Sequence, residues 1–126
     1  MKLWIICILI IMMFTIFSAL SIRYVTKIVD CTCEDLLESV CLFRSGKSYA
    51  SSHKLDEAER HWKDNLTVLG IILSHDEIDA ITTSFAELKA NLNTMDSDDY
   101  YSAAAIMMVQ LNHIRDMQYP LLQNVF

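Results

Sequence analysis

The apolar positions of the chain form one unbroken run at the start, followed by shorter segments with helical spacing. No charged residue occurs between Lys2 and Arg23, and only three hydroxyl side chains interrupt the run from Leu3 to Ile22. Twenty residues of α-helix cover about 30 Å, which is the thickness of the hydrocarbon core of a bilayer. The run therefore predicts a transmembrane helix over residues 3–22.

Two other interpretations of this run remain open. A secretory signal has a shorter apolar region of about 7–15 residues, and only the weak triplet Ala19-Leu20-Ser21 resembles its cleavage site. A buried core helix is the second alternative. Trp4 and Tyr24 lie at the two ends of the run, where aromatic rings favour the membrane interface. The pattern thus favours an uncleaved single span.

The charges that flank the run bear on its orientation. Lys2 and the terminal amine lie on one side, and Arg23 and Lys27 lie on the other, so the comparison of positive charges is nearly balanced. A short N-terminal tail with one lysine is typical of a signal anchor. We expect a single-pass protein of the cell membrane with a cytoplasmic N-terminus. Residues 1–29 would form the anchor with its flanks, and 30–126 an extracytoplasmic α-helical soluble domain.

Four later segments carry apolar residues at steps of three or four and predict helices over residues 33–44, 54–72, 75–92 and 97–118. Thr32 is the expected N-cap of the first, and Gly46 lies where it should stop. With only two Gly and one Pro in the chain, long helices with short connections are favoured. The predicted fold is all-α: an N-terminal transmembrane helix followed by a small antiparallel bundle of about four helices.

The apolar faces of two of these helices lead to specific expectations. The first helix should bury Leu36, Leu37, Val40 and Phe43. In the last helix, one apolar stripe begins at Tyr100, while Ile106 and Val109 lie on nearly the opposite face and His113 lies beside them, where it should be partly buried. That helix is either central to the bundle or presents a second apolar face to a partner.

The charge of the chain excludes one class of function. From Cys31 onward, 7 basic and 15 acidic side chains leave a net charge of about −8. A protein that binds nucleic acid needs a basic surface to neutralise phosphates, so we expect no nucleic-acid partner. Anionic lipid headgroups would also repel this domain, so its contact with the bilayer is expected through residues 3–22.

The stretch LSHDEIDAI, residues 73–81, concentrates polar side chains. Ser74 and Glu77 have the spacing of a capping box, and Leu73 and Ile78 have that of a hydrophobic staple. This pattern predicts a helix start and accounts for most of the cluster. It leaves His75 and Asp79, which are four residues apart on one side of the helix and would serve as the first two ligands of a metal or small-ligand site.

The remaining histidines and the cysteines give weaker signals. His53, Glu57 and His61 share the helix face opposite the apolar stripe, so we expect them to face solvent. Cys31, Cys33 and Cys41 lack the close spacing of a zinc knuckle. Free thiols, a structural disulfide and a metal site all remain open for them. We expect no cofactor.

Several short motifs carry a resemblance to a known family. They are the Lys2–Trp4 start, Trp62, the segment HDEIDAI at residues 75–81 and the ending LLQNVF. Together they resemble a family of small, single-span bacterial membrane proteins carrying a helical domain of unknown function. The resemblance implies a membrane helix followed by a helical remainder, and it implies no catalytic residues.

The sequence contains no phosphate-binding loop, nucleophile elbow or metalloprotease motif, and we expect no enzymatic activity. The favoured function is a membrane-anchored, non-catalytic helical interaction module at the bacterial cell envelope, which binds a protein partner or a second copy of itself. Its contact surface would be Ile106 and Val109 with His113, or the end formed by Tyr100 and Tyr101. The alternative is an extracytoplasmic domain that binds a metal or small ligand through His75 and Asp79.

Overall fold

The computed structural model describes residues 1–117, and it contains five α-helices and no strand in that range. They are α1 (Lys2–Arg44), α2 (Ser48–Asp64), α3 (Leu66–Ile72), α4 (His75–Asn93) and α5 (Ser97–Met117). The prediction of an all-α bundle behind a long apolar helix is confirmed. The predicted last residue of the final helix, Gln118, and Pro120 after it lie outside the described residues.

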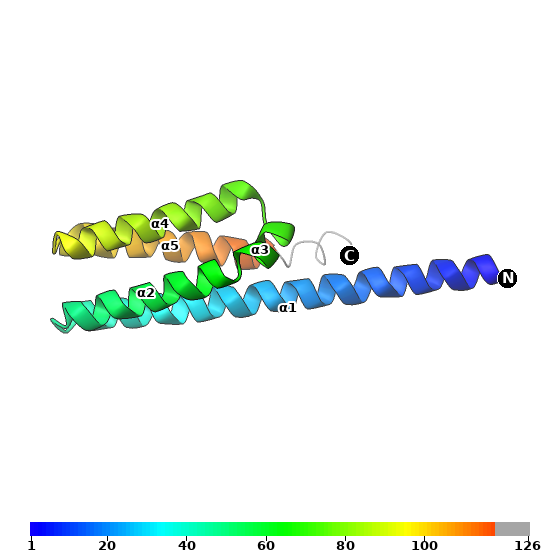
Figure 1. Cartoon of the computed structure of the whole chain (residues 1–126), viewed down its shortest axis with the longest axis horizontal. Coiled ribbons are helices and arrows are strands. Elements are labelled where there is room, and N and C mark those ends of the chain that lie inside the picture. Colours follow the sequence, from blue (N-terminus) through cyan, green and yellow to red (C-terminus); the bar gives the residue numbers. More distant parts are fainter. Residues whose placement is uncertain (118–126) are drawn as a thin grey trace.

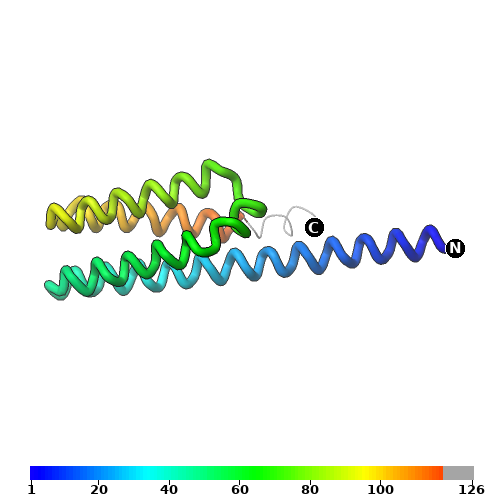
Figure 2. Tube along the Cα trace, in the orientation of Figure 1, coloured from blue at the N-terminus to red at the C-terminus, as the bar shows by residue number. Residues whose placement is uncertain are grey.

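The helices form a bundle from which the first half of α1 projects. Helix α2 runs back along α1, and the hairpin of α4 and α5 packs on this pair (Figure 1). Figure 2 shows that the α1–α2 turn and the α4–α5 turn share one end of the bundle, while α3 lies at the other end, next to the projecting part of α1.

Helix α1 is continuous over 43 residues, or about 65 Å. A separate helix starting at Cys33 with Thr32 as N-cap was therefore a wrong prediction. Thr32 is buried within α1, and its hydroxyl donates to the Ile28 carbonyl at 2.8 Å. Val25 and Val29 are fully buried in the bundle, so the apolar face continues across the expected junction and the helix has no reason to end there. Packing in the bundle begins at Tyr24, ahead of the expected domain start at residue 30.

Two helices end in the same backbone motif. Gly46, with φ +81°, donates to the Phe43 carbonyl, and Lys47 donates to that of Leu42, which is the Schellman pattern. The predicted stop at Gly46 is confirmed. After α4, Met95 occupies the equivalent left-handed position with φ 57°, which costs a residue with a Cβ about 1–2 kcal/mol. Tertiary packing of the hairpin thus overrides a local preference.

The predicted helix over 54–72 is divided at Asn65, contrary to expectation. The Asn65 side-chain amide donates to the His61 carbonyl at 2.7 Å, and its backbone N–H bonds to the Trp62 carbonyl. Asparagine competes with the helical backbone in this way. The Tyr24 hydroxyl also donates to Asn65 Oδ1 at 2.5 Å, which fixes the break against α1. The result is the short helix α3, set off from α2.

The start of α4 has the predicted local structure. Glu77 N–H donates to the Ser74 hydroxyl and Ser74 N–H donates to the Glu77 carboxylate, so the capping box is confirmed. Leu73 is buried and Ile78 packs against the core, as expected of the two staple positions. At α5, the Asp96 side chain accepts a hydrogen bond from Asp99 N–H and caps that helix.

The core runs along the axis of the bundle and draws on every helix. The largest side chains that are fully buried include Trp62, Tyr100, Phe85, Leu36, Leu55, Leu69, Ile81, Leu88, Met107 and Leu111. One predicted core residue is wrong: Leu37 is 52% exposed, and Ser39 is buried on the same helix instead. The register of α1 against α2 and α5 turns Leu37 outward.

Candidate functional site

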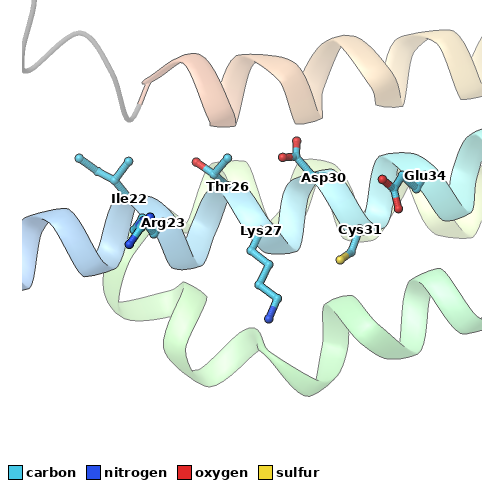
Figure 3. A pocket seen from close by; sticks show the side chains of 7 residues that line it. All are labelled: Ile22, Arg23, Thr26, Lys27, Asp30, Cys31 and Glu34. Atoms are coloured by element: carbon cyan, nitrogen blue, oxygen red, sulfur yellow. The ribbon is translucent and has the colours of Figure 1, made fainter.

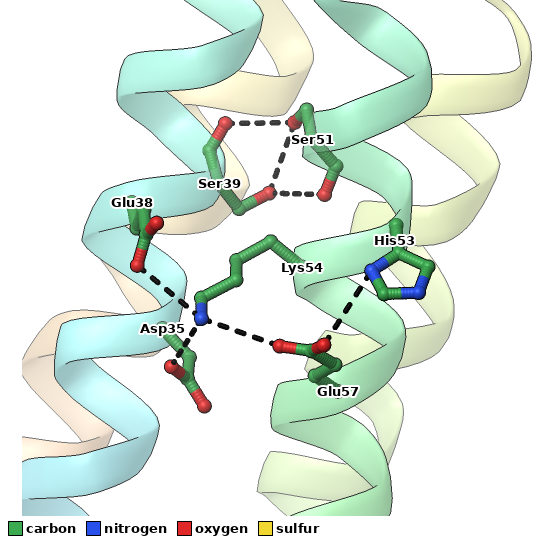
Figure 4. A network of polar contacts seen from close by, with 7 residues as sticks. All are labelled: Asp35, Glu38, Ser39, Ser51, His53, Lys54 and Glu57. Atoms are coloured by element: carbon green, nitrogen blue, oxygen red, sulfur yellow. Dashed lines mark hydrogen bonds and ion pairs between the residues drawn. The ribbon is translucent and has the colours of Figure 1, made fainter.

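Polar side chains inside the bundle link its helices. The Ser39 hydroxyl lies 2.7 Å from the Tyr100 hydroxyl and 3.0 Å from the Ser51 hydroxyl, while Ser51 also donates to the Ser39 carbonyl at 2.7 Å. Figure 4 shows the two serines facing each other between α1 and α2. All three side chains are buried, and each hydroxyl has a hydrogen-bond partner within the network, with Ser39 between the other two. This network fixes α1, α2 and α5 together and leaves none of the three hydroxyls free for chemistry.

A second cluster surrounds the Lys54 ammonium, which lies 3.3 Å from Asp35, 3.3 Å from Glu38 and 3.2 Å from Glu57 (Figure 4). Hydrogen bonds to these carboxylates, led by that to Glu57, raise the pKa of Lys54 above its usual value. Lys54 therefore stays protonated at neutral pH and cannot act as a base. Its role is to join α2 to α1.

A third cluster joins α2 to α4 through Glu59. Lys63 lies 2.6 Å from one carboxylate oxygen, and Lys89 contacts the other oxygen and also Asp56 at 3.0 Å. Burial raises the pKa of Glu59, but the hydrogen bonds from Lys63 and Lys89 outweigh it, so the pKa is lowered overall. The hydrogen bond to Glu59 in turn raises the pKa of Lys89. The cluster is an ion-pair bridge between helices.

The lowered pKa of Glu59 predicts an acid dependence of stability. In the unfolded chain its pKa is about 4.3, so the ionised form stabilises the fold fully above that pH. This stabilisation is lost as the pH falls through the lower folded-state pKa. We expect Glu59→Gln to reduce the free energy of unfolding by about 0.5–1 kcal/mol at pH 7 and by less at acidic pH. Urea unfolding of the full chain in detergent at both pH values measures the change.

Glu87→Gln, on the exposed surface of α4, is the matched control for Glu59→Gln. It should change stability little at either pH. An effect of Glu59→Gln that has the same size at neutral and acidic pH would contradict the prediction.

A shallow groove of about 430 Å³ follows one side of α1, where the exposed apolar segment meets the bundle. Figure 3 shows Thr26 and Asp30 pointing toward α5, while Lys27 and Cys31 point away from α5. Asp30 accepts a hydrogen bond from Arg115 of α5 at 2.7 Å, which raises the pKa of that guanidinium. All seven lining residues come from α1, so the groove is an open strip with basic and acidic groups side by side.

The predicted ligand residues do not converge. His75 and Asp79 are both exposed on the first turns of α4. Within residues 1–117, no group of three or more His, Cys, Asp or Glu side chains is placed to hold a metal ion. His53 is exposed, as expected, and pairs with Glu57 at 3.5 Å. His61 differs from expectation, because it is half-buried.

The cysteines are all unpaired. Cys7 and Cys41 are exposed, Cys31 is half-buried and Cys33 is buried. Burial raises the pKa of the Cys33 thiol, which keeps it protonated and unreactive. Of the three states that the sequence left open for Cys31, Cys33 and Cys41, the structure has the free thiols.

The predicted interaction residues of α5 fall into two groups. Ile106 is 53% exposed and Val109 is 69% exposed, and they lie on an outward face with Ser102, Ala105 and His113. We call residues 102, 105, 106, 109 and 113 the outer face of α5. His113 is exposed rather than partly buried. Tyr100 is fully buried and Tyr101 is half-buried against Phe43, so the tyrosine end belongs to the core rather than to an open surface.

The projecting part of α1 is the largest apolar surface that the structure describes. No residue from Met1 to Leu20 is buried. This finding excludes the interpretation of the run as a core helix. In length and composition, α1 is the one helix among residues 1–117 that is able to cross a membrane, and an N-terminal signal sequence would have the same properties.

Sequence reasoning missed the interhelical polar contacts. Ser39 and Ser51 belong to no sequence motif. Each lies three or four residues from a core leucine, Leu36 or Leu55, and this helical spacing was a usable signal for a buried polar contact. In the sequence, Lys54 is one charged residue of an amphipathic helix and has no distinguishing feature. Its three carboxylate partners come partly from α1, and pairing between helices depends on register, which the sequence of one helix does not contain.

These contacts and surfaces describe a helical bundle in which the clusters around Ser39, Lys54 and Glu59 join neighbouring helices, with open apolar faces on α1 and α5. No curated protein and no solved structure matches the chain. A family model described as a domain of unknown function matches residues 17–125, which include the end of the projecting apolar segment and the bundle. The resemblance is confirmed at this level, whereas bacterial origin and a single membrane span remain predictions. The chain belongs to the DUF4363 family, a domain of unknown function.

Proposed function

We propose that the protein is a membrane-anchored, non-catalytic interaction module of the bacterial cell envelope, with a cytoplasmic N-terminus and an extracytoplasmic bundle. The observation that carries the proposal is the division of α1 into two halves. Its first twenty residues are exposed and almost entirely apolar, while from Val25 onward the same helix is built into the bundle core. A bilayer is the environment that would cover the first half without changing the second.

The outer face of α5 supports binding of a protein partner or of a second copy of this chain. Ile106 and Val109 are exposed next to each other on a helix whose opposite side is buried. Large apolar side chains grouped on an exposed helix face are typical of interaction surfaces. The polar clusters around Ser39, Lys54 and Glu59 are occupied by contacts between helices, which supports a role without catalysis.

The experiment compares Ile106→Asp with wild type by crosslinking in intact membranes, followed by purification of the full chain. We expect Ile106→Asp to lose the crosslinked species, because a carboxylate in an apolar interface is desolvated without a partner. Leu37→Asp is the matched control, since Leu37 is 52% exposed on α1 and lies outside the outer face of α5. If Ile106→Asp folds and keeps every association of the wild type, this surface is not the binding site.

A further inference from the structure

Helix α3 lies against α1 at the point where the exposed apolar segment enters the bundle (Figure 1). Between them is an open groove of about 410 Å³, with Phe17 and Leu20 of α1 on one side and Val68 and Ile71 of α3 on the other. Its lining is almost wholly apolar. The groove is therefore continuous with the apolar surface of the first half of α1.

The outward side chains of α3 are unusually exposed for their type. Ile71 is 76% exposed and Val68 is 42% exposed, while Phe17 and Leu20 opposite them are 62% and 60% exposed. The helix, with the sequence LTVLGII, contains no charged residue. It buries Leu69 on its inner side and presents apolar side chains on its outer side as well. An outer face of this kind is stable in an apolar environment and unfavourable in water.

The position of α3 along α1 is fixed by specific contacts. The hydrogen bond from Tyr24 to Asn65 holds the start of α3 to α1, and Leu69 and Leu73 anchor it in the core. Helix α3 cannot shift along α1 without breaking these contacts. The depth of α3 relative to any membrane crossed by α1 is therefore set by the fold.

We infer that α3 is a second membrane contact, in which Val68 and Ile71 insert among lipid acyl chains at the surface of the bilayer. This inference rests on the proposed span over residues 3–22. Phe17 and Leu20 belong to that span, so side chains that face them across an open groove lie at the same depth. Arg23 and Lys27, the next exposed side chains of α1, then lie at the level of the lipid phosphates (Figure 3).

Lipid suits this groove better than a protein segment because one of its walls is the span itself. A partner on Ile71 would have to displace lipid from Phe17 and Leu20. An interfacial helix with an apolar outer face needs no such exchange, because the bilayer that surrounds the span also covers the helix. Docking of α3 would hold the bundle against the membrane in one orientation.

The test places a tryptophan in α3 and measures its quenching by brominated lipid. Ile71→Trp is made in the full chain with Trp4→Phe, so that Trp62, which is 1% exposed, remains as a constant background. The protein is reconstituted into phosphatidylcholine vesicles with or without bromine on the upper part of the acyl chains. Tyr49→Trp in the same background is the matched control, because Tyr49 is 86% exposed near the start of α2, outside the outer face of α5.

We expect the tryptophan at position 71 to lose fluorescence in brominated vesicles and to emit at shorter wavelength than the one at position 49, which should not be quenched by bromine. Val68→Trp provides the same measurement if Ile71→Trp does not fold. Equal quenching at positions 71 and 49 would overturn the inference. Emission at short wavelength without quenching by bromine would also overturn it, because a second copy or another segment of the chain would then cover α3.

The same vesicles separate this inference from the proposed function on which it rests. The difference between wild type and Trp4→Phe reports the quenching of Trp4, which lies in the proposed span. If Trp4 is quenched and position 71 is not, the span stands and the docking of α3 is wrong. If Trp4 is not quenched by lipid, the membrane anchor itself is wrong, and the docking of α3 fails with it.

Discussion

Replacing both Ile10 and Met13 with arginine should release the full chain from membranes. Both side chains project from the middle of the exposed apolar part of α1, where they are 46% and 62% exposed. An arginine at the centre of a transmembrane helix costs about 2.5–3.5 kcal/mol, so two cost about 5–7 kcal/mol and offset most of the favourable insertion of the apolar residues. The measurement is the fraction of the chain that stays with membranes after an alkaline wash.

The matched control for this variant is Leu37→Arg with Cys41→Arg, which places two arginines on exposed positions of the same helix within the bundle. This control should remain in the membrane fraction. Helicity in detergent should be similar for both variants, because neither pair of side chains belongs to the core. Retention of the Ile10→Arg and Met13→Arg chain at the wild-type level would show that residues 3–22 do not anchor the protein.

Replacing Trp62 with alanine should lower the free energy of unfolding by about 3–5 kcal/mol, a large part of the total of about 5–15 kcal/mol typical of a small domain. Trp62 is 1% exposed and is the largest fully buried side chain among residues 1–117, so alanine would leave a cavity in the core beside the last turn of α2. The measurement is urea unfolding of the full chain in detergent, monitored by the circular dichroism signal of its helices.

Trp62→Phe should be much less harmful, at about 1–2 kcal/mol. The indole N–H of Trp62 is buried and has no hydrogen-bond partner among residues 1–117, so phenylalanine removes an unsatisfied donor together with part of the ring. Trp4→Ala is a second control and should leave unfolding unchanged, because Trp4 is 78% exposed and lies outside the core. Equal losses for Trp62→Phe and Trp62→Ala would mean that the indole N–H makes a stabilising contact.

The continuous helix α1 holds the projecting apolar segment and the bundle in a fixed relative orientation. A flexible linker after residue 22 would let the bundle tumble beside the membrane. In the structure, the helix that carries the apolar segment is also the one on which α2 and α5 pack. On the proposed anchoring, the outer face of α5 would then be presented at a defined height and direction, which is a useful property for an interaction module without catalytic groups.

Local signals predicted the elements whose causes lie within a few residues. The capping box at Ser74 and Glu77 and the stop at Gly46 are formed by hydrogen bonds between neighbours in the chain, so both were correctly predicted. The apolar run from Leu3 to Ile22 likewise predicted a long exposed helix from composition alone. These features depend on contacts between residues close in the chain and not on where the other helices pack.

Thr32 and Asn65 show where local reasoning failed. A threonine before an acidic turn resembles an N-cap, but the apolar face of Val25, Ile28 and Val29 is covered by other helices, and burial keeps α1 intact through Thr32. Asn65 has modest helix propensity in either case. The helix breaks there because Tyr24, 41 residues away, holds the asparagine side chain.

The candidate interaction surfaces also depend partly on local and partly on long-range contacts. The helical period alone places Ile106 and Val109 on the opposite side of the last helix from Tyr100, because it fixes the angle between residues of one helix. The tertiary structure was needed to show that the side with Tyr100 is buried and that the side with Ile106 is open. It was also needed to show that Leu37 faces out and that α3 lies beside Phe17 and Leu20. These outcomes depend on where neighbouring helices pack, which is set by contacts between residues far apart in the chain.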